Sequence, residues 1–276
     1  MTEPSTAPTT APTTVPPGRP LALVTGASSG IGFELARQFA QNGYDLVVNA
    51  ENDEIEQAAQ QLREHGGEVR AVKADLRTYD GVEQLYTSVA SGGRPVDALA
   101  LNAGVGKGGP FVQTELGAEL DLIALNVSST VHLAKRVLVD MVARDQGKVL
   151  VTSSIASTMP GSYQAVYNAS KSFVQSWALA LQEELKDTGV TITSLMPGPT
   201  ETNFFRRAGM LNTPVGGSPS AQDDPALVAR QGFEALLEGK HKVVGGGITT
   251  KTQAALSAVL PDRVKSLAHR FMAQPK

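Results

Sequence analysis

Short apolar runs alternate with longer stretches of helical periodicity through most of this chain. The apolar runs have the length of β-strands and fall at 21–25, 45–49, 68–74, 98–101, 148–154 and 190–196. The helical patterns between them cover about 31–42, 54–65, 82–89, 117–144 and 163–188. Continuous apolar runs are typical of parallel strands that are buried on both faces, and helical crossovers wind such strands into an open sheet. The sequence therefore predicts an α/β fold: a single domain with a doubly wound parallel sheet and helices on both faces.

The two ends of the chain depart from this alternation. Residues 1–20 consist largely of Pro, Thr and Ala with almost no bulky apolar side chain. They cannot offset the entropy of ordering and are predicted to form a disordered arm. The α/β domain is expected to span 21–248, and 249–276 is expected to be a basic amphipathic helical extension. We expect this extension to pack on the core or on another subunit; a membrane surface is the alternative.

Composition narrows the range of partners. The formal net charge is −3, with both signs mixed along the chain, which favours a small-molecule partner over nucleic acid. The chain has no cysteine, which excludes disulfides, thiolate metal ligands and a cysteine nucleophile, and we expect no metal site. No apolar run approaches the roughly 18 residues of a membrane span, and the N-terminus lacks the pattern of a secretory signal. A cytoplasmic protein without a membrane span is therefore expected.

A glycine-rich stretch, Thr25-Gly26-Ala27-Ser28-Ser29-Gly30-Ile31-Gly32, follows the first predicted strand and opens the first predicted helix. Glycines let the backbone approach a pyrophosphate, and a helix N-terminus offers free N–H groups and a positive dipole end. An ordinary glycine turn is the alternative, but the position between strand and helix favours a dinucleotide site in a Rossmann-type sheet. The residues assigned to this site are Gly26, Ser28, Ser29, Gly30, Ile31 and Gly32.

An acidic residue at the end of the second strand normally holds the adenine ribose of a dinucleotide. Glu51 lies 19 residues after Gly32, close to that position. A carboxylate there would repel a 2′-phosphate, and neither Ser29 nor Asn52 supplies the cation that such a phosphate needs. NAD(H) is therefore favoured as the cofactor, with NADP(H) possible. The alternative is that Glu51 begins a solvated helix face.

Two further strand ends contribute candidate cofactor contacts. Asp75 and Leu76 follow the third strand, where the Asp75 carboxylate can accept a hydrogen bond from the adenine amino group; capping of the next helix is the alternative. Asn102, Ala103 and Gly104 follow the fourth strand and begin a glycine-rich loop near the cofactor. An ordinary turn is the alternative for that loop.

Tyr167 is followed four residues later by Lys171, a spacing that places both side chains on one face of a helix. A phenol of ordinary pKa near 10 is a poor acid or base at neutral pH, but a nearby ammonium favours the phenolate and lowers that pKa. The spacing alone fits a surface pair equally well. Ser154, 13 residues before Tyr167 at the end of the fifth strand, and Asn126 in the preceding long helix make the context more specific.

Together these motifs resemble the short-chain dehydrogenase/reductase family. The match rests on TGASSGIG, on NAG at 102–104, on Asn126 and Ser154, on YNASK at 167–171, and on Pro197-Gly198-x-x-x-Thr202. It covers about 21–202, and in combination the motifs are specific. One departure is Leu101, where the family often has a second asparagine before Ala-Gly; a local packing change is expected there.

The resemblance implies roles for individual residues. Tyr167 would be the acid/base, Ser154 would hydrogen-bond the reacting oxygen, and Lys171 would bind the nicotinamide ribose. Asn126 would hold, through its backbone, a water of the proton relay. Pro197, Gly198 and Thr202 would contact the nicotinamide carboxamide. The segment at about 203–224 would be the substrate lid, and the long helices containing Asn126 and Tyr167 would build a homodimer or homotetramer.

The sequence therefore predicts an NAD(P)-dependent oxidoreductase that transfers a hydride between a nicotinamide cofactor and a carbonyl or secondary alcohol. A non-catalytic dinucleotide-binding regulatory or scaffold protein on the same fold is the main alternative, since fold alone does not establish activity. Dehydration or epimerisation on the same scaffold is a third possibility. The identity of the substrate stays open.

Overall fold

A computed structural model describes residues 18–218, 220 and 222–275 of the chain. Its centre is a parallel sheet with the strand order β3-β2-β1-β4-β5-β6-β7. The strands are β1 (Leu21–Thr25), β2 (Asp45–Ala50), β3 (Val69–Lys73), β4 (Ala98–Leu101), β5 (Gly147–Thr152), β6 (Val190–Pro197) and β7 (Lys242–Gly245). The order reverses direction at β1 and β4, which is where a doubly wound sheet forms its ligand crevice. The predicted fold class is confirmed.

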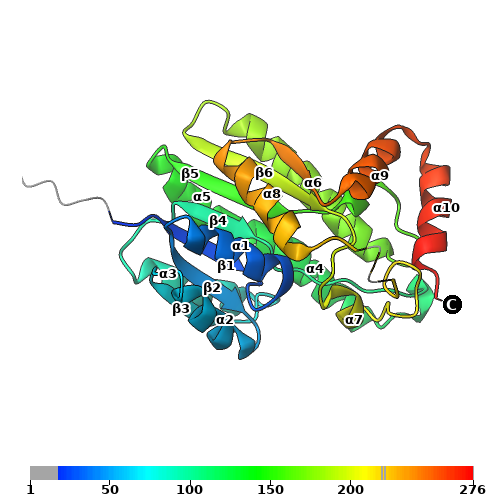
Figure 1. Cartoon of the computed structure of the whole chain (residues 1–276), viewed down its shortest axis with the longest axis horizontal. Helices are drawn as coiled ribbons and strands as arrows, with labels where there is room; N and C mark the ends of the chain where they lie inside the picture. Colours follow the sequence, from blue (N-terminus) through cyan, green and yellow to red (C-terminus); the bar gives the residue numbers. More distant parts are fainter. Residues whose placement is uncertain (1–17, 219, 221, 276) are drawn as a thin grey trace, which may run out of the picture.

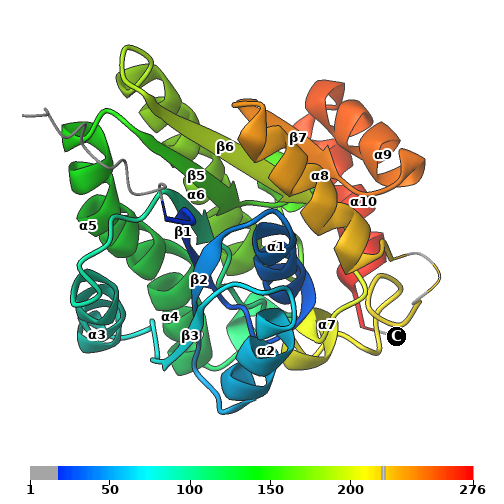
Figure 2. The same cartoon turned by 60° about the vertical axis from the view of Figure 1, so that its left-hand side comes forward.

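Helices cover both faces of the sheet (Figure 1 and Figure 2). One face carries α1 (Gly30–Gln41), α2 (Glu54–Arg63) and α8 (Pro225–Leu237), and the other carries α3 (Tyr79–Ala90), α5 (Ser129–Ala143) and α6 (Ala165–Glu184). The remaining helices are α4 (Leu116–Ile123), α7 (Phe204–Arg207), α9 (Ile248–Val259) and α10 (Asp262–Ala273). Short 3₁₀ turns lie at Phe111–Gln113 and Ile155–Thr158.

The core consists of two apolar layers, one on each face of the sheet. Along β1, Leu21 and Leu23 belong to the layer under α3, α5 and α6, whereas Ala22 and Val24 belong to the layer under α1, α2 and α8. Successive strand residues point to opposite faces, so a strand covered on both sides must be apolar throughout. Phe39 of α1 is fully buried and packs edge-on against Phe233 of α8, with 5.0 Å between the ring centroids.

The long predicted helix at 117–144 is interrupted in the middle. A π-helical turn, Ala124–Ser128, separates α4 from α5 and contains Asn126. The whole run Leu116–Ala143 is long and apolar enough to cross a membrane by length and composition. Leu122, Leu133 and Met141 on this run are nevertheless fully buried in the fold. A helix of this kind is common in the core of non-membrane domains, so the run is weak evidence for a membrane span.

The structure describes the N-terminal segment from residue 18 onward and the C-terminal extension up to residue 275. The predicted disordered arm lies outside the described residues up to residue 17; residues 18–20 have no regular secondary structure, but the Arg19 side chain donates hydrogen bonds to Gly43 O at 3.1 Å and Gly66 O at 2.8 Å. At the other end, α9 and α10 follow β7 and pack beside the sheet (Figure 2). The extension therefore packs on the core, the first of the two placements expected for it.

Candidate active site

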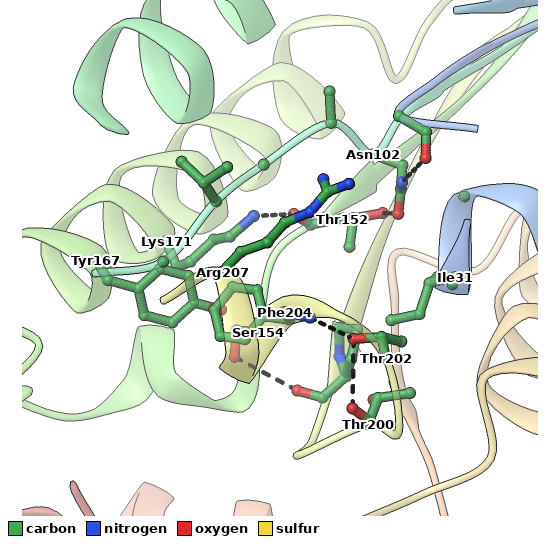
Figure 3. A pocket seen from close by; sticks show the side chains of 18 of the residues that line it. Ile31, Asn102, Thr152, Ser154, Tyr167, Lys171, Thr200, Thr202, Phe204 and Arg207 are labelled. Carbon is green, nitrogen blue, oxygen red and sulfur yellow. Dashed lines mark hydrogen bonds between the residues drawn. The ribbon is translucent and has the colours of Figure 1, made fainter. Parts of the chain in front are cut away.

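The carboxyl ends of the parallel strands border a long cleft with about 1680 Å³ of space, including its opening to solvent (Figure 3). It brings together nearly every residue that the sequence assigned to a site. The assigned residues that line it are Gly26, Ser28, Ser29, Gly30, Ile31, Gly32, Glu51, Asp75, Leu76, Asn102, Ala103, Gly104, Ser154, Tyr167, Lys171, Pro197, Gly198 and Thr202. Asn126 lies behind the wall of the cleft rather than in it.

The loop between β1 and α1 has the shape of a phosphate cradle. Gly26 and Gly30 have positive φ values of 66° and 58°, a conformation that favours glycine. A Cβ on Gly32 would lie only 2.1 Å from Gly26 O. Ser29, the N-cap of α1, makes no side-chain capping bond, so the first N–H groups of the helix face the cleft without a cap. This uncapped, close-packed helix N-terminus fits the pyrophosphate of a dinucleotide.

Asn102 joins three strand ends below this loop. Its side chain donates to Thr25 O at 3.2 Å and accepts from Thr152 Oγ1 at 3.2 Å. Its backbone N–H donates to Thr25 Oγ1 at 3.0 Å. The preceding Leu101, the departure from the family pattern, is buried in the apolar layer with Leu99. The change from asparagine thus adds apolar contact to the core and leaves the bonds of Asn102 in place.

An ion-pair cluster lies where β2 and β3 end. Arg77 forms a two-pronged pair with Asp75, with distances of 2.9 Å from Nε to Oδ1 and 2.8 Å from Nη2 to Oδ2. The same Nη2 lies 3.2 Å from Glu51 Oε2. The Arg77 hydrogen bonds hold the pKa of Asp75 below its usual value. Asp75 is not the cap of α3, because Thr78 accepts the capping bond from Gly81 N at 3.0 Å.

Ser154, at the start of the 3₁₀ turn that follows β5, and Tyr167 of α6 both line the cleft. Ser154 Oγ accepts from Ala156 N at 3.1 Å and lies 3.4 Å from Pro197 O, to which it donates. Burial raises the pKa of Tyr167 to about 12, and the Ser154 side chain acts in the opposite direction to a smaller degree. The expectation that Lys171 lowers this pKa is not met, because loss of hydration of the buried phenolate outweighs the other influences.

Lys171 lies one turn after Tyr167 and is also buried. Its Nζ donates a hydrogen bond to Thr152 O at 2.9 Å, at the end of β5 (Figure 3). Burial lowers the pKa of Lys171 to about 8. A Cβ on Gly104 would be 3.4 Å from this Nζ, so the glycine leaves room beside the amine. Thr152, which sequence reasoning did not single out, therefore positions both Lys171 and Asn102.

Asn126 does not line the cleft but hydrogen-bonds to two segments that border it. Its Oδ1 accepts from Val105 N at 2.9 Å, and its Nδ2 donates to Val105 O at 2.9 Å and to Ser170 Oγ at 3.1 Å. These bonds connect the loop after β4 to α6, the helix that carries Tyr167 and Lys171. Its own carbonyl accepts from Thr130 Oγ1 at 2.9 Å. π-Helical turns loosen the usual ladder of backbone bonds and are frequent at functional sites.

The other half of the cleft is predominantly apolar. The Phe204 ring of α7 lies 5.2 Å from the Tyr167 ring, measured between centroids (Figure 3). Further lining side chains are Ile155, Met159, Phe205, Arg207, Val215, Gln253, His269, Met272 and Ala273. The last four come from the C-terminal helices, which sequence reasoning did not place in the site. Among the described residues, no group of three or more His, Asp or Glu side chains could hold a metal ion.

Fold and cleft together define a dinucleotide-binding α/β protein with buried acid/base candidates beside the nucleotide end. The chain belongs to the short chain dehydrogenase family, whose model matches residues 20–210.

Individual relatives agree with this assignment. Oxidoreductase UcpA of Salmonella typhimurium is 30% identical over 218 residues, which cover 78% of this chain and 79% of that protein. The structure of a short-chain dehydrogenase from Sphingobium yanoikuyae in complex with NADPH has 27% identity and a TM-score of 0.77, covering 87% of this chain and 93% of that one. The structure of L-sorbose reductase from Gluconobacter frateurii, complexed with NADPH and L-sorbose, has 26% identity and a TM-score of 0.73. The match covers 83% of this chain and 96% of that one. The family is one of oxidoreductases.

Proposed function

We propose that this chain is an NAD(P)-dependent oxidoreductase that interconverts a carbonyl and a secondary alcohol, with Tyr167 as the acid/base. One observation carries the proposal: Ser154, Tyr167 and Lys171 line one cleft with the glycine cradle of α1. The cradle fits a dinucleotide, and the three side chains fit a carbonyl oxygen that gains or loses a proton. An intact set of acid/base candidates argues against a purely regulatory or scaffold role.

A bound nicotinamide cofactor would supply or accept the hydride. The residues of the chain handle the oxygen and its proton. During reduction, Tyr167 Oη donates its proton to the substrate oxygen, and the Ser154 hydroxyl hydrogen-bonds that oxygen. The raised pKa of Tyr167 keeps the phenol protonated at neutral pH, which is the state that reduction requires. In this proposal Lys171 binds a ribose hydroxyl of the cofactor, and the hydrogen bond from its Nζ to Thr152 O supports this role by orienting the amine.

The test is a Tyr167→Phe variant assayed with NADH and NADPH on a panel of ketones, aldehydes and secondary alcohols. The variant should lose about 100-fold or more in kcat, the usual contribution of a positioned general acid, while it binds both nucleotides as the wild type does. Tyr163→Phe is the matched control, because Tyr163 lies on the turn before α6 and packs against the apolar cluster around Phe205. Full turnover by Tyr167→Phe would refute the proposal.

For the cofactor, we propose a preference for NAD(H) with NADP(H) also bound. Near the ribose end of the cleft, Arg77 is the partner of three carboxylates, those of Glu51, Asp75 and Asp121, with Nη1 3.7 Å from Asp121 Oδ2. This cluster is net negative and disfavours a 2′-phosphate. The NADPH complexes of the similar structures support the opposite preference, and the guanidinium of Arg77 is the group that a 2′-phosphate would use.

A homodimer or homotetramer also stays a proposal. Its support is a set of large apolar side chains that α4, α5 and α6 leave exposed, Leu116, Leu120, Val139, Phe173 and Leu179. Patches of this kind commonly mark subunit interfaces. Light scattering during gel filtration would give the mass in solution, and a monomer at assay concentration would contradict the expectation. Location in the cytoplasm stays a prediction from the sequence.

A further inference from the structure

The loop that joins Ser154 to Tyr167 is held from outside by the C-terminal helices. Thr158 Oγ1 lies 2.9 Å from Ser257 Oγ of α9, and Lys265 Nζ of α10 donates to Thr158 O at 3.2 Å. The C-terminal extension is therefore part of the wall of the site, not an appendage to the α/β domain.

Further along the same loop, α10 makes a second pair of contacts. Ser162 Oγ donates to Ser266 O at 3.2 Å, and His269 Nδ1 lies 2.9 Å from Ser162 O. Because a carbonyl oxygen can only accept, Nδ1 carries the hydrogen in this bond. A neutral His269 then presents Nε2 as an acceptor.

His269 is the polar residue that α10 directs toward the cleft. It is 5% exposed, it lines the same cleft as Tyr167, and burial lowers its pKa, which favours the neutral ring. No hydrogen bond from the described part of the chain reaches its Nε2. This nitrogen is not among the fully buried polar atoms that lack a partner, so it remains accessible from the cleft and can accept a hydrogen bond from a bound molecule.

The surroundings of His269 are mostly apolar. Phe205, Ala208, Met210 and Ala273 form one cluster in which α10 meets the segment after β6. Val215 N donates to Met272 O at 3.1 Å, which fixes α10 against that segment. A substrate body enclosed here would be largely hydrophobic, with one polar acceptor beside it.

We propose that His269 is a specificity-determining residue of the substrate site and accepts, through Nε2, a hydrogen bond from a hydroxyl group of the substrate. The favoured substrate class is a ketone with an apolar body and a second hydroxyl away from the reacting carbonyl. This inference rests on the proposed oxidoreductase function of the same cleft.

Two substitutions of His269 distinguish the role of its Nδ1 donor from that of its Nε2 acceptor. In His269→Asn the amide N–H₂ can replace Nδ1 and keep the bond to Ser162 O, but nothing replaces Nε2. In His269→Gln the amide oxygen can replace Nε2, while the Nδ1 donor is lost. Arg270→Gln, on the exposed side of α10, is the control for a change in this helix that leaves the cleft untouched.

The probes are ω-hydroxy 2-alkanones of increasing chain length and the corresponding methyl ethers, which cannot donate. The wild type should prefer the hydroxyketone of the fitting length by about tenfold in kcat/KM, the scale of one hydrogen bond. His269→Asn should lose that preference, mainly through KM, and keep the turnover of the ether and the affinity for NADH within about twofold. His269→Gln should retain part of the preference.

Two results would overturn the proposal: a wild type that does not distinguish hydroxyketone from ether at any chain length, or an Asn variant that loses activity on both alike, as a purely structural role requires. Failure of the underlying function would be recognisable separately, because ketone reduction would then be absent or would persist in Tyr167→Phe. Circular dichroism and thermal unfolding of each variant would establish that it folds.

Discussion

The guanidinium of Arg77 lies 3.2 Å from the carboxylate of Glu51, and both side chains are more than one-third exposed. The carboxylate of Glu51 would repel the 2′-phosphate of NADP(H), whereas the guanidinium of Arg77 would attract it, so the preference between the two dinucleotides depends on both charges. We expect Glu51→Gln to shift the ratio of the Kd values for NADPH and NADH by about fivefold in favour of NADPH, the scale of one partly exposed charge interaction. Fluorescence titration at low salt would measure it, and raising the salt should shrink the effect.

Arg77→Gln should move the same ratio in the opposite direction, because it removes the cation available to a 2′-phosphate and leaves Glu51 and Asp75 uncompensated. Lys73→Gln is the matched control: Lys73 ends β3 and pairs at 2.6 Å with Asp53, outside this cluster. If Arg77→Gln weakened NADH and NADPH equally, Arg77 would act only by holding Asp75.

The close packing of the glycine loop before α1 predicts that one added methyl group at Gly32 prevents dinucleotide binding. Gly32→Ala should abolish measurable binding of both dinucleotides, because the new Cβ would lie 2.1 Å from Gly26 O and 2.4 Å from Asn102 Nδ2. Gly117→Ala, in the first turn of α4 where nothing lies within 4 Å of an added Cβ, should leave binding unchanged and stabilise the protein slightly. Wild-type affinity in a folded Gly32→Ala protein would contradict a close-fitting cradle.

Burial of Lys171 predicts how stability depends on pH. Its pKa falls from 10.5 to about 8 on folding, so between these values the unfolded chain binds more protons than the native state. The free energy of unfolding therefore rises with pH across this window. Relative to Lys171→Met, the wild type should gain about 2 kcal/mol between about pH 7 and about pH 9.5.

Urea unfolding at the two pH values would measure this gain. Folding raises the pKa of Tyr167 to about 12, so ionisation of this phenol in the unfolded chain lowers the free energy of unfolding at higher pH. Both pH values lie below that range. A constant difference between wild type and Lys171→Met would mean that the amine keeps its ordinary pKa in the native state.

The apolar layer under α1 predicts a large loss of stability in Phe39→Ala. Phe39 is fully buried and contacts the rings of Tyr44 and Phe233 at 5.1 and 5.0 Å. Removing a buried phenyl ring typically costs about 3–5 kcal/mol. Phe111→Ala removes an exposed ring and should change the free energy of unfolding by no more than about 0.5 kcal/mol. Equal effects of the two substitutions in urea unfolding would contradict this description of the core.

The sequence by itself determined the architecture and most of the candidate site. Strands and helices leave a local period in the chain, and an apolar run without alternation already requires cover on both faces. The glycine loop and the pair Tyr167 and Lys171 are also local, since a turn and one helical repeat fix their geometry. Because parallel strands end at one edge of a sheet, residues that follow those strands had to meet there.

Only the tertiary structure decided the rest. Arg77 pairs with Glu51 across 26 positions of sequence, and His269 of α10 meets Ser162 across 107; neither approach leaves a local signal. The direction of the Tyr167 pKa shift depends on how completely the fold removes water from the phenol, which the spacing to Lys171 does not reveal. The periodicity of apolar residues shows which face of each segment must be buried. Contacts between segments far apart in the chain, and the loss of water that accompanies them, arise only when those segments pack together.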